Sequence, residues 1–188
     1  TGVTLRLEVG DYRLETEDEG GRPVPLVDGL SRSDVPGRPR LPFGSALLAL
    51  PPHTRAVARL ISAGPEETRE ALRVAIAARP DFARDATLGL VPVLTPADPV
   101  LDGVWPATAV QVGEVTTLRE RRFVAVRIFP FRYDEAAARL TLMHELVVRV
   151  DFVGAGHAAS LDALDGEPDP QFDAVFATQV LNWEQGRA

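Results

Sequence analysis

The stretch that most constrains the fold of this chain is residues 119–153, which are rich in apolar and β-branched side chains. From residue 140 onward, every second position belongs to one largely apolar set: Leu140, Leu142, His144, Leu146, Val148, Val150 and Phe152. Alternation with a period of two is typical of a strand that covers a core with one face. Residues 123–133 are apolar on both faces, which favours a more central strand covered on both sides. Because six residues, 134–139, join the two stretches, we expect an antiparallel hairpin on which the sheets assemble.

Further strands are predicted on both sides of this hairpin. The first, residues 3–9, alternates cleanly between apolar and polar side chains, and three shorter ones are expected at residues 24–30, 46–50 and 55–61. Residues 65–79 begin with a proline and two glutamates, which favours a helix, but Leu72, Val74 and Ile76 alternate, and we expect a strand over 71–78. Five prolines within residues 80–110 leave room only for short strands and extended crossings. The predicted fold class is all-β, with two antiparallel sheets packed as a sandwich.

The chain divides into two parts by composition. Residues 1–156 are expected to form the sandwich, and residues 157–188 an acidic linker and a C-terminal segment. Within that segment, apolar residues recur at near-helical spacing: Phe172, Val175, Phe176, Val180 and Leu181. The spacing predicts a short helix that docks on the body of the domain or on a partner.

Composition excludes several functions. The 27 acidic residues outnumber the 20 basic ones, the net charge is −7, and no basic block occurs, which argues against nucleic acid or an anionic membrane as a partner. No run of 18 apolar residues is present, so no membrane span is expected, and no signal peptide is visible. The absence of cysteine excludes disulfides, thiolate metal sites and a cysteine nucleophile.

Other sequence patterns that could indicate a metal or catalytic site are weak. The three histidines, at positions 53, 144 and 157, are far apart and lack the spacing of a zinc site. His144 lies on the apolar face of its strand, which favours a buried, hydrogen-bonded histidine over a metal ligand. The acidic residues of 162–173 lack the pattern of a calcium loop and favour a solvated linker. We therefore expect no catalytic residue, no metal and no cofactor.

Two groups of residues together carry a resemblance to a known family. The first is Pro36-Gly37-Arg38-Pro39-Arg40-Leu41-Pro42, followed after a strand by Leu50-Pro51-Pro52. The second is Trp105-Pro106, then Gly113-Glu114-Val115, then Arg119 and the strand that follows it. In this order they resemble the N-terminal propeptides of gingipain-like (family C25) cysteine peptidases. The match covers roughly residues 30–155, and residues 172–183 are similar to the segment that leads such propeptides into the peptidase.

The resemblance implies a prodomain that assists folding and holds a secreted, extracytoplasmic cysteine peptidase inactive until it is cleaved away. A C25 peptidase needs a Cys–His pair, and this chain has no cysteine, so the chain is expected to be the accompanying domain and not the enzyme. Its implied partner is the cognate C25 peptidase domain.

The resemblance also implies an inhibitory loop. In the family, the connection at residues 113–122 carries an arginine-bearing turn, and a propeptide arginine blocks the arginine-specific members. The candidates here are Arg119 first, then Arg121, with Arg122 beside them. The alternative is that Arg119 pairs with a carboxylate such as Glu114 to hold the turn. Because the chain has no lysine, this mechanism implies an arginine-directed peptidase.

Arg187 follows the acidic linker and is a candidate processing site; the alternative is that the chain merely ends there.

Two alternatives from other classes stay open at the level of sequence. One is a carbohydrate-binding module, in which Trp105, Phe129, Phe131 and Trp183 would line a sugar-binding face. The other is an adhesion or scaffold domain of a surface or secretion system, which would bind a protein without inhibiting it.

Overall fold

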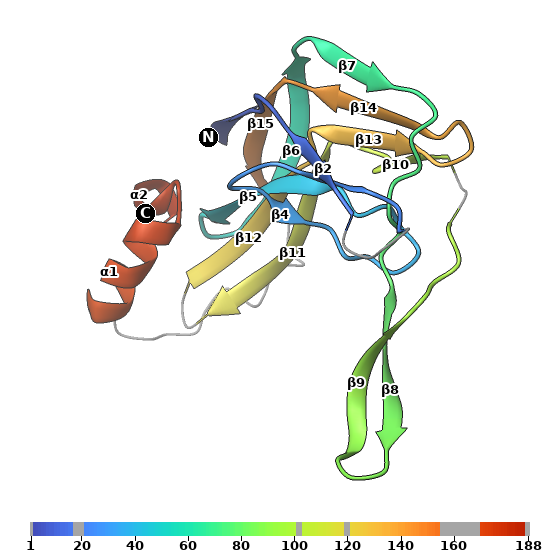
Figure 1. The fold of residues 1–188 in the computed structure, drawn as a ribbon. Helices are drawn as coiled ribbons and strands as arrows, with labels where there is room; N and C mark the ends of the chain where they lie inside the picture. The colour runs from blue at the N-terminus through green and yellow to red at the C-terminus, as the bar shows by residue number, and fades with distance from the viewer. Residues whose placement is uncertain (1, 17–20, 101–102, 119–120, 155–169, 187–188) are drawn as a thin grey trace.

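The computed structural model describes residues 2–16, 21–100, 103–118, 121–154 and 170–186 (Figure 1). Nearly all of its regular structure is antiparallel strand, which confirms the predicted all-β class. The strands are β1 (Gly2–Glu8), β2 (Arg13–Glu15), β3 (Val24–Leu26), β4 (Ser31–Arg32), β5 (Pro42–Ala49), β6 (Thr54–Ala63), β7 (Glu66–Arg69), β8 (Arg79–Asp85), β9 (Gly89–Thr95), β10 (Val104–Trp105), β11 (Val110–Leu118), β12 (Arg121–Ile128), β13 (Phe131–Asp134), β14 (Arg139–Met143) and β15 (Glu145–Gly154). Two helices follow, α1 (Pro170–Gln179) and α2 (Trp183–Gly186).

Two sheets form the predicted sandwich. One has the strand order β1-β15-β6 and the other the order β11-β12-β5-β4. Alternate residues of both sheets meet in one core, listed here from the first sheet and then from the second: Leu5, Leu146, Val148, Val150 and Phe152; Leu48, Val124, Val126 and Ile128. The alternation that begins at Leu140 in the sequence therefore does identify the buried face.

The predicted hairpin is present, but its two long strands are each broken, and that part of the prediction is wrong. β13 pairs with β14 from Phe131↔Leu142 to Asp134↔Arg139, so the connection is where it was expected but is shorter, residues 135–138. The first break falls at Phe129-Pro130, where proline has no N–H to continue a ladder. The second falls at His144, whose backbone N–H donates to Pro65 O (3.0 Å) and whose carbonyl accepts from Val9 N (2.8 Å).

The first break moves the chain from the sandwich into another sheet, β10-β13-β14-β7, and the second returns it to the sandwich. That sheet covers a second core, made of Val9, Leu41, Val74, Phe131, Tyr133, Leu140 and Leu142. Alternation with period two continues through the break at His144, so the sequence shows one strand there where the fold has two. At Phe129-Pro130 the buried positions change from even to odd numbers, but residues 123–133 are apolar on both faces, so the sequence shows no break there either.

Two further expectations need correction. Residues 71–78 are extended but form no strand; a single bridge, Ile76↔Pro39, and backbone hydrogen bonds to residues 23, 37, 38 and 40 hold them. Residues 79–95 form a hairpin of two seven-residue strands, longer than the prolines suggested. Pro80 and Pro92 are tolerated there because β8 and β9 pair with each other and with no other described strand.

The C-terminal segment forms the predicted helix and docks on the body of the domain. Phe176, Val180 and Trp183 pack with Ala49 and Phe123 in a third apolar cluster on the outer face of the β12–β5 pair. The acidic linker expected before it lies outside the described residues. Among the described helices, none is long and apolar enough to cross a membrane.

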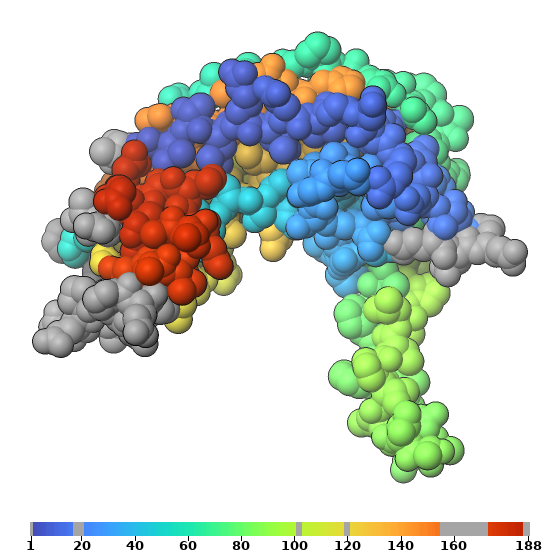
Figure 2. Space-filling view, turned by 60° about the vertical axis from the view of Figure 1, so that its left-hand side comes forward, coloured from blue at the N-terminus to red at the C-terminus, as the bar shows by residue number. Residues whose placement is uncertain are grey.

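The β8–β9 hairpin and the C-terminal helices both project from the sandwich, and a hollow lies between them (Figure 2).

Candidate inhibitory interface

Two of the predicted inhibitory arginines lie at one end of the β11–β12 pair. Arg121 and Arg122 begin β12, and they lie opposite Leu118 and Thr117 at the end of β11. Arg119 follows Leu118 in the sequence and lies outside the described residues, as does Arg187. The two described candidates are therefore part of a paired strand, next to the connection that carries Arg119.

Arg121 is engaged within the domain. Its guanidinium lies 3.5 Å from Asp173 Oδ2 of α1 and 5.5 Å from the ring centre of Trp183 in α2. Its side chain is only 18% exposed. This arrangement lets Arg121 tie the start of β12 to the C-terminal segment.

Arg122 is held at its backbone, where its carbonyl accepts a hydrogen bond from Leu50 N (2.9 Å).

The C-terminal segment is attached along β5. β4 pairs with β5 only at Pro42 and Phe43, which leaves the far half of that edge open to residues 180–182. Leu181 N donates to Leu47 O (3.2 Å), and Val180 forms a parallel bridge with Leu47.

Asn182 completes this attachment and was missed by the sequence analysis. Its side-chain amide is buried, accepts from Ala49 N (2.8 Å) and donates to Ala49 O (2.8 Å). It thus pairs with a backbone unit as another strand would. An Asn just before Trp183 in an otherwise apolar tail is the sequence signal that could have identified it.

Aromatic rings join the same two elements. Phe176 of α1 stacks on Phe123 of β12 with ring centres 4.9 Å apart, and it lies 6.3 Å from Trp183. The β11–β12 end, which carries the candidate arginines, and the C-terminal segment are therefore packed against each other.

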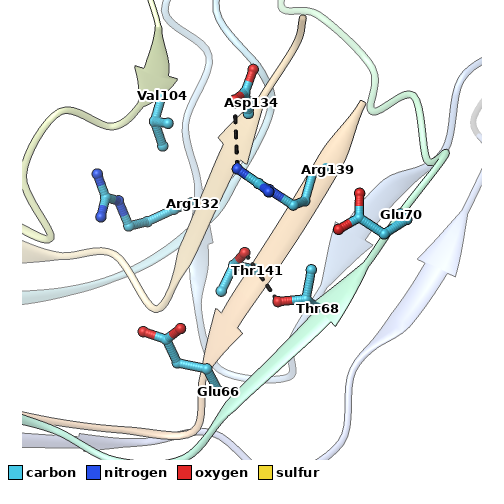
Figure 3. Close-up of a pocket in the computed structure, with 8 residues that line it drawn as sticks. All are labelled: Glu66, Thr68, Glu70, Val104, Arg132, Asp134, Arg139 and Thr141. Atoms are coloured by element: carbon cyan, nitrogen blue, oxygen red, sulfur yellow. Dashed lines mark hydrogen bonds and ion pairs between the residues drawn. The ribbon is translucent and has the colours of Figure 1, made fainter. Parts of the chain in front are cut away.

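A polar groove lies elsewhere, on the outer face of the β10-β13-β14-β7 sheet (Figure 3). Acidic, basic and hydroxyl side chains line it. Asp134 and Arg139 form an ion pair at 3.8 Å, and the hydroxyls of Thr68 and Thr141 are hydrogen-bonded at 3.4 Å. It holds no nucleophile beside a base, so nothing in it resembles a catalytic arrangement. Within the ranges that the structure describes, no three His, Cys, Asp or Glu side chains gather as metal ligands.

The remaining candidates have structural roles. His144 Nδ1 lies 3.0 Å from Val9 O and Nε2 lies 3.6 Å from Glu67 Oε2, so the predicted hydrogen-bonded histidine is present. Its side chain is 35% exposed, which makes it less buried than expected.

The aromatic residues considered for a sugar-binding face do not form one. Phe129, Phe131 and Trp183 are buried, and the ring of Trp105 packs edge-on against Phe129.

Comparison with known proteins decides the family. The family Propeptide_C25 matches residues 12–186 of this chain. The chain belongs to the C25 propeptide family. This propeptide is therefore the non-catalytic part of a C25 peptidase zymogen.

Solved structures show the same fold. The complex of Porphyromonas gingivalis RgpB pro- and mature domains matches the propeptide with a TM-score of 0.71 and 16% identity, over 96% of this chain and 92% of that one. A structure described as giving insight into the zymogenic latency of gingipain K from Porphyromonas gingivalis matches with a TM-score of 0.62 and 21% identity, over 81% of this chain and 87% of that one. No match was found among curated proteins.

Proposed function

We propose that this propeptide keeps a secreted C25 cysteine peptidase latent, assists its folding and is released by cleavage. Family membership supports a role beside a peptidase, and the two solved relatives are described as a pro- and mature-domain complex and as a case of zymogenic latency. The partner is the cognate peptidase domain, and residues 157–188 lead toward it from the sandwich of residues 1–156.

The observation that carries the inhibitory role is the position of the β11–β12 end beside the C-terminal segment. Arg121–Asp173 and Phe123–Phe176 hold these two elements together. A peptidase domain that continues from the C-terminal segment would begin on the same side as the candidate arginines. Its active site would then be within reach of the connection that carries Arg119.

We assign the pocket-filling role to Arg119 ahead of Arg121 and Arg122. Arg121 would have to leave Asp173 and Trp183 to enter a specificity pocket, and Arg122 lies one step further into β12. The paired strands on either side, Val110–Leu118 and Arg121–Ile128, provide a preorganised base for the connection. Preorganisation lowers the ordering cost of binding, which favours a tight complex. An arginine at this place implies an arginine-directed peptidase.

The experiment is a titration of the mature cognate peptidase with wild-type propeptide and single variants whose folding has been verified by circular dichroism. Arg119→Ala should weaken inhibition by roughly 2–5 kcal/mol, because a charged pocket loses its partner. Arg121→Ala should affect thermal stability more than inhibition. Arg127→Ala, at an exposed position further along β12, is the matched control and should leave inhibition unchanged. If Arg119→Ala inhibits as well as wild type, no arginine decoy operates there, and simple steric cover remains as the mode of inhibition.

Release is proposed to follow cleavage at Arg187. Mass spectrometry of the matured full-length product would show a new N-terminus at residue 188 if this is the processing site. A mature N-terminus well away from residue 188 would exclude it.

A further inference from the structure

The β8–β9 hairpin, called the arm below, projects from the sandwich as a separate element (Figure 1). Its strands pair with each other from Arg79↔Thr95 to Asp85↔Gly89 and join no other described sheet. Every residue of β8 is exposed. An isolated two-stranded hairpin is marginally stable in water, so an arm of this length is unusual unless something else uses it.

The turn at the end of the arm is well defined. Asp85 Oδ1 accepts hydrogen bonds from the backbone N–H groups of Thr87 and Leu88, both at 2.8 Å. Gly89 has φ +80°, a conformation that glycine adopts without strain. The turn of the arm therefore has a defined conformation, held by the side chain of Asp85.

One face of the arm is apolar. The cross-strand pairs Pro80↔Leu94, Phe82↔Pro92 and Arg84↔Leu90 place their side chains on the same side of the hairpin. Of these, Phe82, Leu90 and Leu94 are 68%, 72% and 75% exposed. Contiguous exposed apolar side chains on a soluble domain mark interaction surfaces.

The arm borders the hollow seen in Figure 2, across from the C-terminal helices. The elements across the hollow, the β11–β12 end and the C-terminal segment, also carry exposed apolar side chains, Leu118 in the first and Val175 and Leu181 in the second. At the base of the arm, Pro80 and Leu94 form one wall of a groove whose other walls include Arg22, Asp34 and Arg40. A globular body held at the β11–β12 end would fill the hollow and reach the arm.

We infer that the apolar face of the arm, Phe82, Leu90 and Leu94, is a second docking contact for the peptidase domain, on a surface outside that domain's active site. This inference rests on the proposed function, because the β11–β12 end supplies the first contact. Two contacts on one chain act together, since binding at the first places the second at high effective concentration. The arm should therefore slow dissociation of the complex more than it changes association.

The test uses a double variant, Phe82→Ser/Leu90→Ser, in which both changed side chains are exposed and so the fold should be preserved. Ile61→Ser is the matched control, because Ile61 is 54% exposed and belongs to the end of β6 that leads to β7, and Figure 1 shows that end of β6 remote from the arm. Dissociation from the immobilised mature peptidase should be roughly tenfold faster for the double variant and unchanged for the control. Equal dissociation of wild type and double variant, with wild type inhibiting normally, overturns the proposal.

A second measurement separates the two contacts. When the catalytic cysteine of the peptidase is covalently capped by a small active-site reagent, the pocket is closed to the arginine but the arm's contact is still available. Wild-type propeptide should retain weak binding to the capped peptidase, and the double variant should lose it. No residual binding of wild type to the capped peptidase, although it inhibits the uncapped enzyme, contradicts a second contact.

Two other outcomes are distinguishable. If wild type neither binds nor inhibits the peptidase, the proposed function fails and this inference with it. If wild type sediments as a dimer and the double variant as a monomer, while both inhibit equally, the arm binds a second copy of the chain, and the inference is overturned.

Discussion

The C-terminal segment and the arm both carry apolar side chains outside the two-sheet core, but those of the segment are packed against the domain and those of the arm are exposed. In the C-terminal segment, Val180 and Trp183 are buried and Phe176 stacks on Phe123. In the arm, Phe82 and Leu90 are largely exposed.

The difference lies in the backbone. Residues 180–182 reach an open edge of β5, and Asn182 completes the pairing with Ala49. The two strands of the arm pair with each other, and no other described strand pairs with either of them, so the arm lacks such an attachment to its own domain. Apolar content alone does not determine what an element covers; an available sheet edge does.

The largest effect is expected in the two-sheet core, and it sets the scale for the comparison. Leu146 is completely buried, so Leu146→Asp places an unpaired charge among apolar side chains and should cost roughly 4 kcal/mol or more, enough to unfold the domain. Glu145→Arg, on the outer face, loses a surface ion pair with Arg6 (3.3 Å) and should cost about 1 kcal/mol or less. Equal thermal shifts for the two variants would show that the assignment of faces is wrong.

The next effect concerns the attachment itself. Asn182→Ala removes two buried hydrogen bonds and leaves the N–H and C=O of Ala49 without these partners, which should cost about 2–3 kcal/mol. Denaturant unfolding followed by tryptophan fluorescence measures it, and Gln185→Ala, an exposed amide three residues on, is the control. A loss no greater than that of the control would mean that apolar packing, and not the sheet edge, holds the segment.

A matched pair of phenylalanines compares the two elements directly. Phe176→Ala should destabilise the isolated propeptide by about 2 kcal/mol, because a stacked, partly buried ring is lost. Phe82→Ala should change stability by less than about 0.5 kcal/mol, because the ring is exposed. Urea denaturation of both variants decides the matter, and a comparable loss in both would mean that the arm packs on its own domain.

The smallest effect is a dependence of the arm on pH. The backbone N–H groups of Leu88 and Thr87 hold the pKa of Asp85 below its ordinary value of 3.8. The ionised carboxylate therefore stabilises the turn fully above about pH 4, and this contribution is lost as the pH falls through the lowered pKa. Amide exchange at Leu88, measured by NMR and corrected for intrinsic pH effects, should rise relative to that of core strands in acid. In Asp85→Asn this rise should be absent, and an equal rise in both proteins would rule out the carboxylate.

The sequence was sufficient for the fold class because alternation depends on local chemistry. Residues 140–152 show which side chains are buried, whichever sheet they join. It did not reveal the break at His144, because burial continues on the same alternate positions through it. It did not reveal the break at Pro130, because residues 123–133 are apolar on both faces and the change of buried face cannot be seen. The arm was underestimated since Pro80 and Pro92 exclude a central strand but not a two-stranded hairpin.

The candidate site was also predictable only in part: its arginines were identified, but their contacts were not. The cluster of arginines near residue 120 was found from family resemblance. The ties of Arg121 to Asp173 and Trp183, about 50 to 60 positions away in the sequence, depend on the docking of the C-terminal helices. Asn182 was missed because a single amide carries no periodic signal.

The most direct test of the account is hydrogen–deuterium exchange of the propeptide, free and in complex with the mature cognate peptidase. The account predicts slower exchange on binding at both borders of the hollow, in residues 110–128 and in residues 79–95. Strands β7 and β14, which line the polar groove of Figure 3, should be unaffected. Protection of the groove, with none at the β11–β12 end or the arm, would contradict it.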